Sequence, residues 1–71
     1  MDYLKWSKQY LKEAQMIKDH IKKVREELKC ARSKKQATDI YYRIASLYQI
    51  YYELRETARK VARYAQEVEN D

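Results

Sequence analysis

Glycine, proline and phenylalanine are absent from this chain of 71 residues, and cysteine, histidine and tryptophan occur once each. Without glycine or proline, the chain lacks the usual residues of tight β-turns and of the glycine-rich loops that bind phosphate. A single cysteine cannot form an internal disulfide, and one thiol plus one imidazole falls short of a zinc site. The sequence therefore predicts an all-α protein without a metal or cofactor.

Long hydrophobic runs are also missing. The longest uncharged stretch, residues 44–52, has nine residues, whereas a membrane-spanning helix needs about twenty apolar ones. Lys5 and Lys8 interrupt the N-terminal region, so we expect no export signal, and a free thiol then favours the cytoplasm. A domain this small buries little surface, so we expect self-association to complete its core.

Apolar residues recur every three or four positions in both halves of the chain, which is the pattern of two amphipathic helices. The first series is Tyr3, Ser7, Tyr10, Ala14, Ile17, Ile21, Val24, Leu28 and Ala31. The second is Ala37, Ile40, Ile44, Leu47, Tyr51, Leu54, Ala58, Val61, Ala65 and Val68. Their heptad frames differ by two residues, a shift that a continuous coiled coil does not absorb. We therefore expect a break between them.

An antiparallel two-helix hairpin is the predicted fold, in a single domain over 1–71. The first helix is expected over about 2–31, the turn at about 32–36 and the second helix over about 34–69. Asp2 is suited to cap the first helix, Ser33 with Gln36 forms a capping box for the second, and Asn70 is suited to end it. A single uninterrupted helix that dimerises is the alternative, but it would have to absorb the frame shift.

The two series fit each other in one register, in which the numbers of opposing residues sum to 68. Large residues then face small ones towards the open end, as interdigitation requires. On one flank this register brings Glu27 near Arg43, so that opposite charges meet.

Two further apolar patches lie outside this seam. Tyr41, Ala45, Tyr48 and Tyr52 form a second stripe, for which we expect no partner within the chain, and Trp6, Ile50 and Tyr64 cluster on the opposite flank. Exposed patches of this kind mark interfaces, so we expect two hairpins to pair into a four-helix bundle. A stacking platform for nucleic acid or another ligand is the alternative interpretation of the tyrosines.

Basic residues are concentrated in the first half of the chain, where 11 basic residues stand against 5 acidic ones over residues 1–35. A ridge of them is predicted to run beside the tyrosine stripe: Lys18, Lys22, Arg25, Lys29 and Arg32. Proteins that bind single-stranded nucleic acid combine cations and rings in this way. A solvated helix face explains the same pattern without a ligand.

Groups capable of catalysis are sparse. His20 has no carboxylate or thiol at ligand spacing, and Cys30 has no partner base. The sequence therefore predicts a non-enzymatic protein-interaction module that forms a homodimer or larger homo-oligomer and docks another protein. A nucleic-acid-associated protein that uses the basic ridge is the alternative function.

Overall fold

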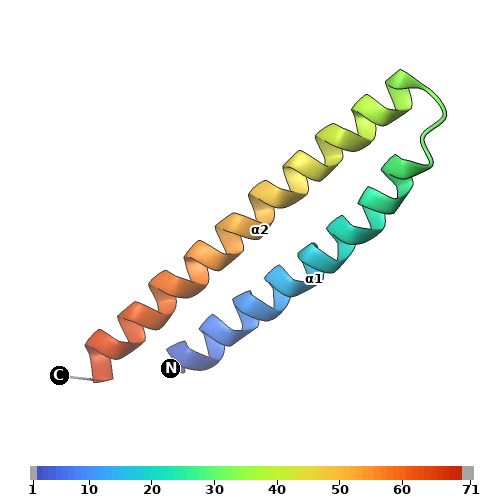
Figure 1. Ribbon diagram of the computed structural model, residues 1–71. Helices are drawn as coiled ribbons and strands as arrows, with labels where there is room; N and C mark the ends of the chain where they lie inside the picture. The colour runs from blue at the N-terminus through green and yellow to red at the C-terminus, as the bar shows by residue number, and fades with distance from the viewer. Residues whose placement is uncertain (1, 70–71) are drawn as a thin grey trace.

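The computed structural model describes residues 2–69, the last of them by its backbone alone, and shows two long helices folded back on each other (Figure 1). Helix α1 spans Tyr3–Lys29 and helix α2 spans Lys34–Glu69. The predicted all-α hairpin is confirmed. Asn70 lies outside the described residues, so the predicted end of the second helix is not described there.

The first helix ends two residues earlier than predicted. The backbone N–H groups of Cys30 and Ala31 donate to the carbonyl oxygens of Glu27 and Leu28, at 3.1 and 3.2 Å. These i to i−3 bonds tighten the last turn and satisfy carbonyls that would otherwise lack a partner. The chain then reverses over residues 30–33, and no described residue has a positive φ. The turn therefore has no need of glycine.

Side chains cap the start of both helices, as predicted. A carboxylate oxygen of Asp2 accepts a hydrogen bond from the N–H of Lys5 at 3.0 Å, and Ser33 Oγ accepts from the N–H of Gln36 at 3.1 Å. The side-chain oxygen of Gln36 accepts from the N–H of Arg32 at 3.0 Å. A standard capping box would use the N–H of Ser33 instead. The side chain of Gln36 thus ties the turn to the second helix.

The core is the predicted seam between the helices. Ile21, Val24, Ile40 and Ile44 form its buried centre. Every described seam residue except Val68 is buried or half-buried. Val68 is 47% exposed, because a register that sums to 68 has no residue of α1 opposite it. Glu27 and Arg43 form the expected ion pair on the flank, at 3.3 Å.

Ser7, the polar member of the seam, is 6% exposed. Its hydroxyl donates a hydrogen bond to the backbone carbonyl of Ala58 across the helix pair, at 2.9 Å. Burial of the hydroxyl is therefore compensated, as buried polar groups require.

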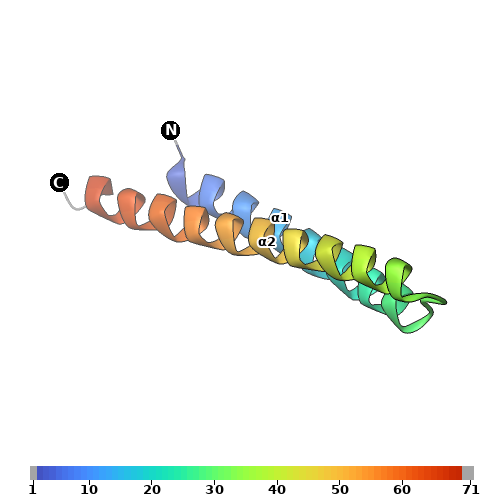
Figure 2. The same cartoon turned by 90° about the horizontal axis from the view of Figure 1, so that it is seen from above.

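The hairpin is long and thin, measuring 58 × 14 × 13 Å. Viewed from above, the two helices lie alongside each other, and the last turns of α2 extend beyond the start of α1 (Figure 2). Within the described residues, neither helix is long and apolar enough to cross a membrane. Because the molecule is one helix pair thick, most side chains outside the seam lie at the surface.

Candidate interaction surfaces

Two faces flank the seam, one on each side, and each combines residues of both helices. A residue directly after a seam position lies on one face and a residue directly before it lies on the other, because successive residues of a helix turn by about 100°. We name them the tyrosine face and the tryptophan face. The tyrosine face contains Leu4, Lys8, Leu11, Gln15, Lys18, Lys22, Arg25, Lys29, Arg32, Tyr41, Ala45, Tyr48, Tyr52, Arg55, Arg59 and Ala62. The tryptophan face contains Trp6, Glu13, Met16, His20, Lys23, Glu27, Cys30, Asp39, Arg43, Ile50, Glu53, Lys60, Tyr64 and Glu67.

Shallow grooves along the seam support this division. Leu11 and Gln15 of α1 line one groove together with Tyr51 and Arg55 of α2. The groove on the other side lies near the turn, and its lining includes Glu27, Cys30, Asp39 and Arg43. Each groove therefore brings side chains of the two helices together on one face.

The tyrosine stripe is only partly free. Tyr48 is half-buried and packs against the core cluster, so the prediction that the whole stripe lacks a partner within the chain is wrong at this residue. Tyr41 and Tyr52 remain 63% and 61% exposed. The rings of Tyr48 and Tyr52 are nearly parallel, with centroids 6.2 Å apart and an angle of 23° between their planes. The anchored Tyr48 ring therefore supports an exposed neighbour.

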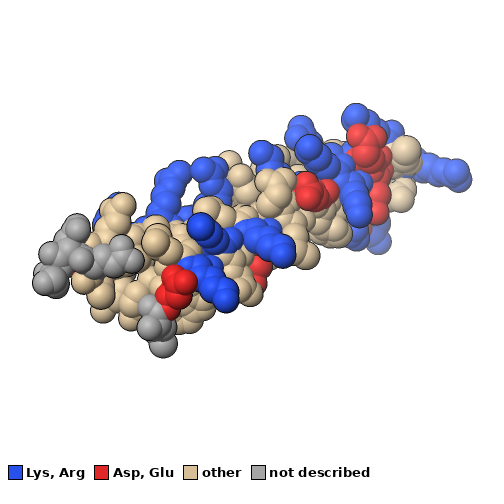
Figure 3. All heavy atoms as spheres, turned by 90° about the horizontal axis from the view of Figure 1, so that it is seen from below, with Lys and Arg blue, Asp and Glu red and all other residues tan. Residues whose placement is uncertain are grey.

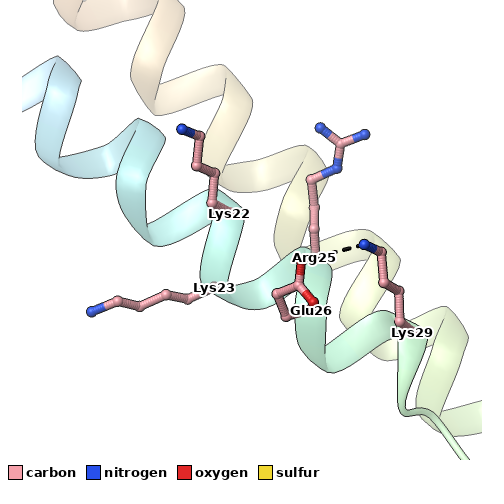
Figure 4. Close-up of a pocket in the computed structure, with 5 residues that line it drawn as sticks. All are labelled: Lys22, Lys23, Arg25, Glu26 and Lys29. Carbon is pink, nitrogen blue, oxygen red and sulfur yellow. Dashed lines mark hydrogen bonds and ion pairs between the residues drawn. The ribbon is translucent and has the colours of Figure 1, made fainter.

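The basic ridge of the first half is exposed throughout, from Lys18 to Arg32. Lys22, Arg25 and Lys29 point to one side of α1, whereas Lys23 points away from them (Figure 4). Lys29 pairs with Glu26 at 3.3 Å, and both side chains are more than 70% exposed. Such a surface pair contributes little energy, so it leaves Lys29 available to another anion.

The tyrosine face carries charge of one sign. Its basic residues are Lys8, Lys18, Lys22, Arg25, Lys29, Arg32, Arg55 and Arg59. None of its positions within residues 3–68 holds an acidic residue. Elsewhere the signs mix, and the side drawn in Figure 3 shows acidic side chains between the basic ones. The tyrosine face is thus the strongly cationic surface of the hairpin.

Arg55 and Arg59 were missed by the sequence prediction, which followed the tyrosine stripe only as far as Tyr52. Continuing the same spacing of three and four residues would have found them. The guanidinium of Arg55 lies 5.6 Å from the centroid of the Tyr51 ring, and its Nη1 donates to the Tyr51 hydroxyl at 3.4 Å. These contacts hold Arg55 half-buried along the seam.

The tryptophan face has a different character. Tyr3 of the seam contacts Trp6 and Tyr64, with ring centroids 6.3 and 5.0 Å away. Trp6 and Tyr64 of the predicted cluster therefore meet at a third ring. Ile50 does not join them, because it lies 14 residues from Tyr64 on the same helix, or about 21 Å along it. Ile50 and Met16 are exposed on the same face. Its charged residues are mixed: Lys23, Arg43 and Lys60 against Glu13, Glu27, Asp39, Glu53 and Glu67.

Two side chains considered for metal binding or catalysis remain, His20 and Cys30. Both are exposed. No group of three His, Cys, Asp or Glu side chains in the described part of the chain could hold a metal ion. Comparison with models of protein families, with curated proteins and with solved structures found no match to this chain.

Proposed function

We propose that this chain is a non-enzymatic, cytoplasmic interaction module that pairs with a second copy through the tryptophan face. The two hairpins would form a four-helix bundle and leave the tyrosine faces free for a further macromolecule. The observation that carries the proposal is the amount of surface that one hairpin leaves exposed.

One chain exposes 6153 Å² of surface. A compact monomer of 8.7 kDa would expose about 4,700 Å² by the usual scaling of surface with mass. The excess of about 1,400 Å² is more than the roughly 800 Å² that each partner buries in a standard protein interface. A second copy could therefore cover surface that the hairpin cannot bury by itself.

Charge favours the tryptophan face for this contact. Its three basic and five acidic residues give a net charge of −2, against +8 on the tyrosine face, so a second copy meets less repulsion there. Trp6, Met16, Ile50 and Tyr64 supply exposed apolar area along it, and aromatic residues and methionine are enriched in protein interfaces. Two tyrosine faces, in contrast, would bring sixteen basic side chains together, and the juxtaposition of like charges across an interface is unfavourable.

Two matched variants of α2 test the proposal. Ile50 and Tyr52 are two residues apart, both exposed, and lie on opposite faces. Light scattering should give twice the mass of one chain for the natural protein and for Tyr52→Glu. Ile50→Glu should give the mass of a single chain, because it places a carboxylate within the proposed apolar contact.

A monomeric natural protein with intact helices, as measured by circular dichroism, would rule out the bundle. A dimer that survives Ile50→Glu but dissociates with Tyr52→Glu would move the interface to the tyrosine face. Measuring at several salt concentrations separates apolar association from contacts between charges, because salt screens the latter.

A further inference from the structure

We propose that the tyrosine face binds single-stranded nucleic acid, with phosphates along α1 and bases stacked on the rings of α2. The proposal goes beyond self-association and uses the face that the proposed dimer leaves free. Its occupant is indicated by charge complementarity, because eight positions of the face are basic and none within 3–68 is acidic, with Glu26 and Glu56 standing at its outer edge. Nucleic acid supplies both a regular line of anions and aromatic bases.

Cations and rings lie in two parallel tracks. On this flank the numbers of opposing residues sum to 66, two less than in the seam, which places Arg25 opposite Tyr41 and Lys18 opposite Tyr48. The groove in which Leu11 meets Arg55 follows the same offset. With 1.5 Å per residue, Lys18 to Lys29 and Tyr41 to Tyr52 each extend about 16 Å. A strand whose phosphates follow the ridge therefore has its bases within reach of the rings.

The rings are suited to stacking because they are exposed yet supported. Tyr41 and Tyr52 present most of their surface to solvent, and Tyr48 packs between Tyr52 and the core. Tyrosine loses little conformational entropy on binding, since two torsions define its position. In a duplex each base is covered by its stacked neighbours and offers no face to a tyrosine ring. A single strand can expose its bases, so the rings favour single-stranded nucleic acid.

Salt dependence gives the first test. The natural protein is titrated into fluorescently labelled poly(dT) and poly(U) of 20 nucleotides, and anisotropy is followed at several salt concentrations. If four of the cations contact phosphates, log K should fall with log salt at a slope of about −3. Affinity that does not change with salt would overturn the proposal.

Charge reversal on the ridge gives the second test. Lys22→Glu with Arg25→Glu should weaken binding by about tenfold or more, because phosphate contacts are lost. The dependence of log K on log salt should also become less steep, because fewer counterions are released. Lys5→Glu with Lys12→Glu is the matched control, because it changes net charge equally at exposed positions of α1 outside both faces. An equal loss in the control would show that overall charge, and not this face, binds the strand.

The rings give the third test. Tyr52→Ala should weaken binding by roughly 5- to 100-fold without changing the salt slope, and Tyr52→Phe should restore it, because each stacked base contributes an aromatic contact. Tyr42→Ala, an exposed neighbour outside the face, is the control. Unchanged affinity of Tyr52→Ala, or equally tight binding of poly-glutamate or duplex DNA, would overturn the assignment to single strands.

The result is independent of the proposed dimer. Ile50→Glu should keep the dependence on salt and on Tyr52, because the tyrosine face is present in each hairpin. A natural protein that is monomeric but binds the strand would therefore remove the proposed function alone. A stable dimer that binds no strand would remove only the nucleic-acid proposal.

Discussion

Ser7 is buried in the seam, where its neighbours along the stripe are apolar, and it joins the two helices by its hydrogen bond to the Ala58 carbonyl. Ser7→Ala should lower the free energy of unfolding by about 1 kcal/mol, because it removes this bond while leaving the packing nearly unchanged. Urea denaturation at fixed protein concentration measures the effect. Ser46→Ala, at an exposed position of α2, should change stability by less than about 0.5 kcal/mol.

Ser7→Val separates packing from hydrogen bonding. A purely apolar seam would favour valine, but the added methyl groups must fit beside Ala58, which is 1% exposed. Overpacking of this kind costs about 1–3 kcal/mol. A valine variant more stable than the natural protein would contradict the tight contact between the helices at this layer.

At the scale of the helical elements, the cap at Ser33 defines where α2 begins. Ser33→Ala should lower stability by about 1 kcal/mol, because the N–H of Gln36 loses its acceptor. Ser33→Asp should retain the stability, since a carboxylate also accepts this bond and interacts favourably with the helix N-terminus. Thermal unfolding followed by circular dichroism measures both variants. Equal melting temperatures for Ser33→Ala and the natural protein would show that packing alone positions the turn.

The two helices, the break between them and both helix starts could be predicted, because each depends on residues close together in the sequence. The frame shift between the two stripes indicated the break, and Asp2 and Ser33 indicated both helix starts. The end of α1 was predicted less well, since Ala31 continues the apolar stripe although the last turn tightens at Cys30. Apolar periodicity does not report how a chain leaves its helix, and neither glycine nor proline marks the position.

At the scale of the whole molecule, the proposed dimer should have a melting temperature that rises with protein concentration, because dimerisation stabilises the folded state by mass action. Scans over a hundredfold range of concentration should show this rise for the natural protein. Ile50→Glu should melt at a lower temperature that does not depend on concentration. A constant melting temperature for the natural protein would indicate that the hairpin is stable alone.

The sequence by itself determined the two helices, the break and the register, because all three follow from the spacing of residues along the chain. Only the tertiary structure decided the individual side-chain contacts. These are the acceptor for the Ser7 hydroxyl, the half-burial of Tyr48, and the contact of Tyr3 with both Trp6 and Tyr64. It also showed how much surface remains exposed on the pair of helices. Such features depend on distances across the helix pair, and the helical period does not specify those distances.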